Sequence, residues 1–216
     1  MDAVEYIRGL AAESLARDDA VGWWDTLYVA AGEGVTAIPW DRGGPHRLLA
    51  SWAAEHQPPD RGRALVVGCG LGADAEFLAA QGWTTTAFDV SPEAVRTARE
   101  RFPDSPVEYA VADLFALPEG FAGGFDLVLE SMTVQALPRA LRERAVAAVR
   151  SLVAPGGTLL VIAAVADESQ DENVAGPPWP LTRADVESFA RDGLDARRIE
   201  QIDLDGAARW RAEFGR

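Results

Sequence analysis

Several absences limit what this chain of 216 residues can be. Its single cysteine, Cys69, excludes an internal disulfide and a metal site of several cysteines, and favours a reducing environment. No apolar run reaches the ~18 residues of a membrane-spanning helix, and the N-terminus is acidic where a secretion signal would be basic. The two histidines, His46 and His56, lack the spacing of a metal pair. We therefore expect a cytoplasmic protein with no membrane span and no metal ion.

Lysine is absent altogether. All 20 basic residues are arginine, against 34 acidic residues, so the net charge is −14. Without lysine, Schiff-base chemistry and the phosphate-binding P-loop are excluded. The negative charge disfavours nucleic acid as a partner. A chain of this length buries a core that needs neither metals nor disulfides. We expect a small-molecule substrate, no nucleic acid and no obligate protein partner.

The hydrophobic pattern from residue 64 onward alternates between short β-branched runs and longer helical segments, which is typical of a parallel sheet covered by helices. The expected strands span residues 64–67, 84–88, 107–111, 125–129, 158–163, 197–203 and 208–214. The expected helices between them span residues 74–81, 92–101, 139–153 and 183–191, the last one capped by Thr182 with Asp185 three residues on. This predicts an α/β fold: a Rossmann-like, doubly wound, seven-stranded, mostly parallel sheet over residues 61–216.

Residues 1–60 do not fit this alternation. Residues 2–17 and 46–54 have helical patterns, and the segment between them is rich in aromatic and turn-forming residues. We expect this N-terminal segment to cover the carboxyl edge of the sheet, within a single domain spanning residues 1–216. The alternative is a packing helix with tryptophans in the core.

Three glycines, Gly68, Gly70 and Gly72, follow the first strand at alternate positions. Glycine permits a positive φ and lets a ligand approach the backbone, and ligands of such sheets bind beyond the strand ends. Dinucleotide folds prefer G-x-G-x-x-G, but here Ala73 takes the third glycine's place and Asp74 would oppose a phosphate. The spacing therefore favours a nucleoside ligand without phosphate, and a nicotinamide oxidoreductase is the alternative.

Carboxylates end the next three expected strands. Asp89, followed by Val90, can accept hydrogen bonds from both hydroxyls of a ribose. Asp113, followed by Leu114, is placed to accept from an adenine amine, although both acids could instead be ordinary loop caps. Glu130 ends the fourth strand.

With these motifs in order, residues 64–164 resemble the class I S-adenosylmethionine-dependent methyltransferases. The resemblance implies S-adenosylmethionine as cofactor, with the Gly68–Gly72 loop around its methionine and Asp89 and Val90 at its ribose. It places Asp113 and Leu114 around the adenine and Glu130 near the reactive methyl group. Glu130 would orient the cofactor, accept a substrate proton, or serve the structure only.

The flanking segments resemble one branch, the thiopurine, thiol and halide methyltransferases and their tellurite-resistance relatives. The matching motifs are Trp24-x3-Tyr28, Pro39-Trp40-Asp41-Arg42-Gly43 and Gly176-Pro177-Pro178-Trp179. The resemblance implies that Trp24, Tyr28 and Trp40 fold over the cofactor, and that Thr133 and Trp179 line the substrate pocket. Residues 130–135 lack the aromatics of those relatives, so the substrate need not be a halide or small thiol.

These features predict an enzyme that transfers a methyl group to a small molecule by in-line displacement. A thiol or similar soft nucleophile is the expected acceptor; since a thiol ionises near neutral pH, no catalytic base is assigned. Two alternatives stay open: an O- or N-methyltransferase of a small aromatic or natural product, and a non-catalytic protein that binds S-adenosylmethionine. The acids of residues 167–173 are expected to form a solvated loop.

Overall fold

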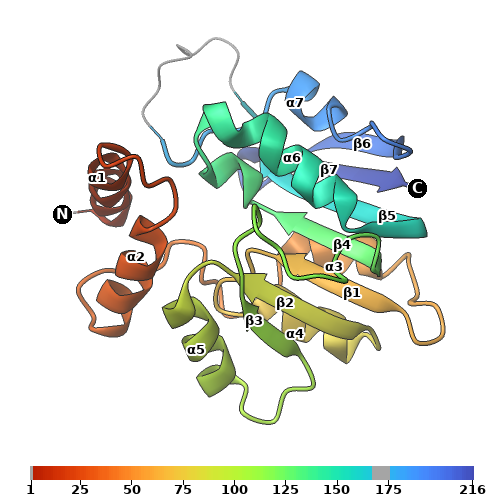
Figure 1. Ribbon diagram of the computed structural model, residues 1–216, viewed down its shortest axis with the longest axis horizontal. Helices are drawn as coiled ribbons and strands as arrows, with labels where there is room; N and C mark the ends of the chain where they lie inside the picture. The colour runs from red at the N-terminus through yellow and green to blue at the C-terminus, as the bar shows by residue number, and fades with distance from the viewer. Residues whose placement is uncertain (1, 167–175) are drawn as a thin grey trace.

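The computed structural model describes residues 2–166 and 176–216, so the acidic loop expected at 167–173 lies outside the described residues. Seven strands form one sheet in the order β3-β2-β1-β4-β5-β7-β6 (Figure 1). The strands are β1 Arg63–Val67, β2 Thr84–Asp89, β3 Glu108–Val111, β4 Phe125–Ser131, β5 Val153–Ala164, β6 Asp195–Leu204 and β7 Ala207–Gly215. The pairs among β1 to β5 are parallel, whereas β7 runs antiparallel to β5 and to β6. The seven-stranded, mostly parallel sheet is confirmed.

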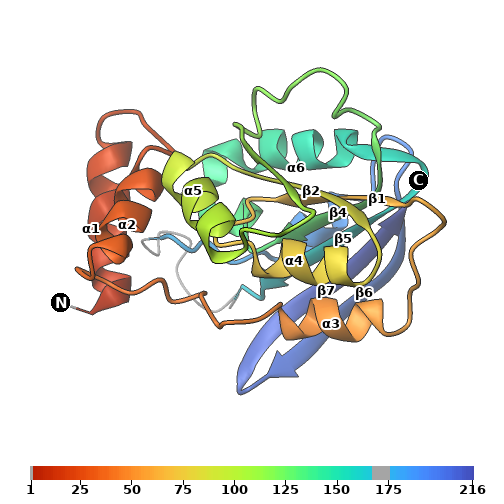
Figure 2. The same ribbon diagram turned by 90° about the horizontal axis from the view of Figure 1, so that it is seen from below.

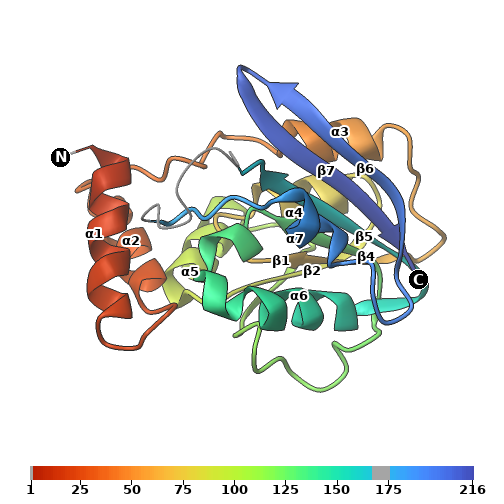
Figure 3. The same ribbon diagram turned by 90° about the horizontal axis from the view of Figure 1, so that it is seen from above.

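Helices cover both faces of the sheet. The helices α3 Arg47–Ala53, α4 Ala73–Ala80 and α5 Pro92–Arg101 pack on one face, and α6 Arg142–Ser151 and α7 Arg183–Glu187 pack on the other. Figures 2 and 3 show α3 and α6 on opposite sides of the strands. Successive strand residues such as Val66 and Val67 serve opposite faces, because side chains alternate along a strand. With both faces covered, the carboxyl ends of the strands remain available for a site.

Some helix bounds differ from those expected. The helix expected over 139–153 begins with the 3-10 turn η2 Arg139–Leu141 and ends at Ser151, because β5 already starts at Val153. The helix expected over 183–191 ends at Glu187, although its predicted capping box is present, with Thr182 and Asp185 bonded reciprocally. Helix boundaries are set by tertiary packing as well as by local pattern, which explains these shifts.

The N-terminal segment contains a helix that the sequence pattern did not predict, α2 Trp23–Gly32, next to α1 Ala3–Leu15. Leu27 and Tyr28 of α2 pack with Ile7 of α1 and Ala94 of α5 in a small apolar cluster of their own. Figures 1 and 2 show α1 and α2 beside α5 at one end of the molecule. We call residues 2–46 the cover.

The side chain of Asp25 is one of those that join the cover to the core. Asp25 Oδ1 accepts hydrogen bonds from Ser91 Oγ at 2.7 Å and from the Glu93 amide at 2.9 Å, at the start of α5.

The helix α3 lies in a different place from the expected cover. Its residues Leu49 and Trp52 are buried against the face of the sheet and not at its edge. The expectation that residues 1–60 act as one covering unit is therefore corrected: α3 belongs to the packing of the core.

No helix among the described residues is long and apolar enough to cross a membrane.

Candidate active site

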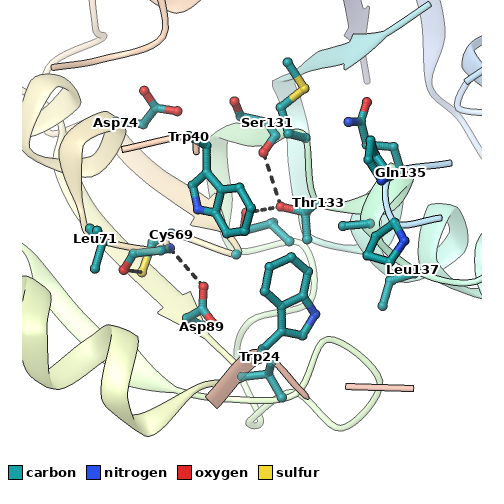
Figure 4. A pocket seen from close by; sticks show the side chains of 18 of the residues that line it. Trp24, Trp40, Cys69, Leu71, Asp74, Asp89, Ser131, Thr133, Gln135 and Leu137 are labelled. Atoms are coloured by element: carbon teal, nitrogen blue, oxygen red, sulfur yellow. Dashed lines mark hydrogen bonds between the residues drawn. The ribbon is translucent and has the colours of Figure 1, made fainter. Parts of the chain in front are cut away.

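A cavity of about 420 Å³ lies between the carboxyl ends of the strands and the cover (Figure 4). Most of the predicted site residues line it: Trp24, Tyr28, Trp40, Gly68, Gly70, Asp89, Val90, Asp113, Leu114 and Thr133. Gly72, Glu130 and Trp179 do not line it. The convergence of segments from the cover and from the ends of β1 to β5 identifies this cavity as the candidate active site.

The glycine loop forms the floor of the cavity beyond β1. Gly68, Gly70 and Gly72 have φ values of 63°, 51° and 90°, the left-handed region that the spacing predicted. A Cβ on Gly68 would lie 2.5 Å from Thr133 Oγ1, and a Cβ on Gly70 would lie 3.0 Å from the Tyr28 hydroxyl. The loop therefore needs glycine for its backbone conformation. It also needs glycine because Thr133, just beyond β4, and Tyr28 of the cover lie close above it.

Gly72 has a packing role. A Cβ there would lie 2.4 Å from the Tyr109 hydroxyl, which donates to Glu76 Oε1 at 2.6 Å. The glycine thus lets β3 pack against the start of α4, and the prediction that Gly72 contacts the cofactor finds no support in the cavity lining.

Asp89 fixes the shape of the loop as well as facing the cavity. Its Oδ2 accepts from the Gly70 amide at 2.9 Å and its Oδ1 accepts from the Ser91 amide at 3.0 Å. Burial raises the pKa of Asp89, and these two amides oppose that effect. Each carboxylate oxygen can accept further hydrogen bonds, so the ability to meet two ribose hydroxyls is retained.

The cavity continues over the ends of β2 and β3. Val90 and Leu114 supply apolar lining there, and Asp113 Oδ1 accepts from the Phe115 amide at 2.8 Å. This bond leaves the other oxygen of Asp113 without a protein donor among the described residues, so it can accept from a ligand amine.

The aromatic residues of the cover close the cavity over the glycine loop. Trp40 Nε1 donates to the Tyr28 hydroxyl at 3.3 Å, and the Trp24 and Trp40 rings meet edge to face with centroids 5.5 Å apart. Burial raises the pKa of Tyr28 well above its ordinary value, so its hydroxyl stays neutral. Figure 4 shows Trp24, Trp40 and Thr133 around one space, with Asp89 at its side, below Cys69. The predicted cover aromatics therefore do come together.

Glu130 lies beneath the site and holds a turn of the chain. Its side chain is 0% exposed, and Oε1 accepts from the amides of Thr133 and Val134, both at 2.8 Å. Its Oε2 has no hydrogen-bond partner among the described residues, and burial raises its pKa to about 7. Thr133 Oγ1 in turn donates to the Val67 carbonyl at 2.9 Å. Glu130 thus positions Thr133 against the glycine loop, which fits the structural role among those expected for it. It is not among the residues that line the cavity, so its contact with the cofactor stays a prediction.

Trp179, expected at the substrate pocket, is not among the residues that line the cavity, and its contact with a substrate stays a prediction. Pro177 and Pro178 line the cavity, whereas the Trp179 ring covers Gly176, where a Cβ would lie 2.4 Å from the ring. The Trp179 amide donates to the Gln135 carbonyl at 2.7 Å. This motif is therefore a packed turn that brings the two prolines to the site.

Several polar residues line the cavity that the sequence motifs did not assign to it, among them Arg42, His46, Asp74 and Arg209. Asp74 Oδ1 accepts from the His46 amide at 2.7 Å, and burial raises the pKa of Asp74. Arg42 lies in the Pro39–Gly43 motif and Asp74 directly follows the glycine loop, so their positions in the sequence could have predicted that they line the cavity. His46 and Arg209 carried no such signal, because only the tertiary fold brings β7 to the cover.

These features fit a nucleoside cofactor such as S-adenosylmethionine. Gly68 and Gly70 leave the backbone of the loop open to a ligand, Asp89 retains capacity for two hydroxyls, and Asp113 retains an oxygen for an amine. Asp74, at the first turn of α4, gives this end of the cavity negative charge where a pyrophosphate would need positive charge.

Comparisons with known proteins agree with this geometry. The thiopurine S-methyltransferase family matches residues 21–214. The chain is 31% identical over 182 residues to a thiopurine S-methyltransferase of Xanthomonas campestris, with 77% of this chain and 82% of that protein covered. It is 27% identical over 177 residues to probable thiol methyltransferase 2 of Arabidopsis thaliana, covering 80% and 73% of the two chains.

The fold is also similar to solved structures. One is the 1,6-didemethyltoxoflavin-N1-methyltransferase of Burkholderia thailandensis with bound S-adenosylhomocysteine, at a TM-score of 0.70 and 16% identity, covering 89% and 87% of the two chains. Sheet order, glycine loop and matches together define an S-adenosylmethionine-dependent methyltransferase. Within that class, the chain belongs to the thiopurine S-methyltransferase family.

Proposed function

We propose that this enzyme transfers the methyl group of S-adenosylmethionine to the thiol of a small molecule. The observation that carries the proposal is that the cover aromatics and the glycine loop line a single cavity, in a chain whose family match spans residues 21–214. The thiopurine and thiol methyltransferases to which the chain is similar are named for sulfur acceptors.

In this proposal the cofactor occupies the end of the cavity above β1 to β3. Gly68 and Gly70 lie under its methionine, Asp89 and Val90 meet its ribose, and Asp113 and Leu114 surround its adenine. Trp24, Tyr28 and Trp40 close over it and exclude water. Thr133 borders the acceptor, held in place by Glu130.

When bound, the cofactor supplies a methyl group already activated by its sulfonium. The protein then needs to hold the acceptor sulfur in line and keep water out. A thiol has a pKa of about 8.5, so a useful fraction is thiolate near neutral pH without a strong general base. The apolar and aromatic lining suits a soft, polarisable sulfur.

The test is transfer of label from methyl-labelled S-adenosylmethionine to a panel of thiols, phenols, amines, iodide and tellurite, with products identified by mass spectrometry. We expect labelled thioethers to dominate. Label found only on oxygen or nitrogen, or never leaving the cofactor, would overturn the proposal.

Asp74 favours a second candidate function, methyl transfer to a phenol or amine. Such acceptors need a general base, and Asp74 is a cavity carboxyl whose pKa burial raises toward the useful range. The substitution Asp74→Asn keeps an oxygen for the His46 amide but removes the base. It should abolish transfer to a phenol and leave transfer to a thiolate at pH 9 largely intact.

A further inference from the structure

One glutamine side chain offers a hydrogen-bond donor to the cavity. Gln135 lies in the 3-10 turn η1 Val134–Ala136, just beyond β4, and lines the cavity although only 6% of it is exposed. Its Oε1 accepts from the Ala164 amide at 2.6 Å, at the end of β5. Because a backbone amide can only donate, this bond fixes which end of the side chain is the oxygen. The NH₂ group, which has no partner among the described residues, is left for a ligand.

The position of Gln135 is fixed by its neighbours. Its backbone carbonyl accepts from the Trp179 amide at 2.7 Å, in addition to the bond between its side chain and Ala164. The amide of the preceding residue, Val134, donates to the buried Glu130 at 2.8 Å. A side chain that is already held at its oxygen loses little further freedom when its nitrogen binds a ligand, so the donor is preorganised.

The sheet order places this donor beyond the cofactor end of the cavity. β1, β4 and β5 are neighbours in that order, and they lead to the glycine loop, to Thr133 and to the Ala164 amide that Gln135 binds. Figure 4 shows Thr133 between Cys69 of the glycine loop and Gln135. β2, which carries Asp89, is three strands away from β5, roughly 14 Å along the sheet. Gln135 therefore faces the part of the cavity in which the acceptor meets the cofactor.

The lining around Gln135 suits an ion held with little water. Leu137, Pro177 and Pro178 give this part of the cavity apolar surface. A hydrogen bond from a neutral N–H to an ionised atom is charge-assisted, and apolar neighbours strengthen it by excluding water. The amide itself does not titrate, so it stays a donor over the whole pH range in which a thiol ionises.

We propose that Gln135 is a catalytic residue whose side-chain N–H binds the sulfur of the acceptor in its thiolate form. The thiol loses its proton to solvent, and the sulfur lone pair then forms the new S–C bond while the methyl–sulfonium bond breaks and leaves its electron pair on the cofactor sulfur. The donor thus increases the fraction of bound acceptor that is ionised near neutral pH. This rests on the proposed function for sulfur as the reacting atom, although a phenolate oxygen would use the same donor.

The first experiment measures kcat against pH with thiophenol as acceptor, because the acidic limb of this profile reports ionisation within the complex. Gln135→Met keeps the length of the side chain but removes the donor. It should move the limb upward by about one pH unit, so that kcat on the limb falls about tenfold. Gln135→Glu keeps an oxygen for the Ala164 amide but sets a negative charge against the thiolate, so its shift should be at least as large. Gln201→Glu is the matched control: Gln201 is exposed on β6, outside the cavity, and the profile should not move.

The second experiment reads the ionisation of a bound ligand without turnover. On protein loaded with S-adenosylhomocysteine, 4-nitrophenol serves as an oxygen analogue whose coloured phenolate is titrated by absorbance. Bound to the unchanged protein, it should ionise about one pH unit lower than when bound to Gln135→Met. The charged groups nearby are the same in both proteins, so the difference isolates the donor. These groups are Glu130 beneath the turn and, in the lining, Asp41, Arg42, Asp74, Asp89, Asp113 and Arg209.

A purely structural role for Gln135 predicts a different pattern. Gln135→Glu, which keeps the bond to Ala164, would then match the unchanged protein, and Gln135→Met would lose stability without moving the pH profile. Either result overturns the proposal, and so does 4-nitrophenol that ionises alike in the unchanged protein and in Gln135→Met. A loss of affinity for S-adenosylhomocysteine of more than about threefold in both variants would assign the donor to the cofactor instead.

The two experiments also separate this proposal from the thiol function. If no thiol is methylated but 4-nitrophenol shows the shift and Gln135→Met removes it, the thiol function fails and the Gln135 donor stands. If thiophenol is methylated with the same pH profile in the unchanged protein and both Gln135 variants, the thiol function stands and the donor fails.

Discussion

The two ends of the cavity are built in different ways. Above β1 to β3, each site residue lies at or just beyond the end of its own strand. Its carboxylate contacts join neighbouring turns: Asp89 accepts from Gly70 and Ser91, and Asp113 accepts from Phe115. Above β5 and β7, side chains from the cover, β4 and β7 converge from distant parts of the chain. The first end is fixed by turn geometry, which suits an unchanging cofactor, and the second by tertiary packing, which suits a particular acceptor.

The largest effect is expected at the floor of the cofactor end. Gly68→Ala forces a non-glycine residue to a φ of 63° and places Cβ 2.5 Å from Thr133 Oγ1. Left-handed strain and overpacking together should cost about 2–5 kcal/mol of unfolding free energy and abolish detectable binding of S-adenosylhomocysteine. Urea denaturation and calorimetry measure the two effects.

Gly120→Ala is the matched control for Gly68→Ala, because it introduces the backbone strain of a positive φ without a steric clash. Gly120 has a φ of 88°, but no atom lies within 4 Å of the position of its Cβ, and it is outside the cavity. It should lose about 1–2 kcal/mol and keep ligand binding. Equal losses for both variants would mean that Thr133 does not crowd Gly68.

The second-largest effect is expected on the pH dependence of stability, and it comes from Glu130 on β4, the central strand between the two ends of the cavity. Burial raises its pKa to about 7 from an ordinary value near 4.5, so between these pH values the native state holds a proton that the unfolded state has lost. The contribution of Glu130 to the free energy of unfolding therefore falls as pH rises through this window, by about 3 kcal/mol.

Glu130→Gln removes this titration and keeps an oxygen for the amides of Thr133 and Val134. Urea denaturation from pH 5 to pH 8 should show the variant gaining stability relative to the unchanged protein as pH rises. Parallel stability curves would show that the buried carboxyl does not titrate in this range.

The sequence predicts the cofactor end of the cavity better than the end above β5 and β7. The strands were predictable because β-branched runs alternate with helical segments, and the glycine loop and Asp89 were predictable because they follow those runs directly. Arg209 and His46 were not, because no local pattern states that β7 inserts beside β5 and faces the cover. Glu130 was correctly located near a strand end, but its side chain is buried, because β4 is the central strand and helices cover both faces of the sheet.

The third effect tests Asp89 as the ribose ligand. Its two oxygens accept different amides, so Asp89→Asn sets an NH₂ group against either Gly70 or Ser91 and removes the charge. Loss of a charge-assisted bond of about 1.5–3 kcal/mol should weaken binding of S-adenosylhomocysteine roughly 10- to 100-fold in calorimetry.

Asp25→Asn is the matched control. Both of its hydrogen bonds end on one oxygen, which an amide keeps, and Asp25 does not line the cavity. Its affinity for S-adenosylhomocysteine should change little. A similar loss in both variants, or none in Asp89→Asn with an intact fold, would place Asp89 outside the binding contacts.

The smallest effect is expected from Trp40→Ala. Comparing it with Trp23→Ala tests whether the cover closes over the cofactor or only packs against the rest of the fold. Trp23 is 3% exposed inside the α1–α2 cluster, whereas Trp40 is 37% exposed at the rim of the cavity. Trp23→Ala should cost about 3–5 kcal/mol of stability. Trp40→Ala should leave the Tm of the ligand-free protein within a few degrees, since a ring that is already exposed contributes little to packing.

Trp40→Ala should instead weaken cofactor binding about tenfold and lower turnover. The loss should be greater for S-adenosylmethionine than for S-adenosylhomocysteine, because only the former carries a sulfonium that an aromatic face attracts, a contact of about 0.5–2 kcal/mol. Hydrogen exchange across residues 18–45 should also slow when S-adenosylhomocysteine binds, since the aromatic rings of the cover gain a surface to pack against. If Trp40→Ala lowers the Tm as much as Trp23→Ala and leaves both affinities unchanged, the cover is scaffold, and the closing of its aromatic residues over the cofactor has to be abandoned.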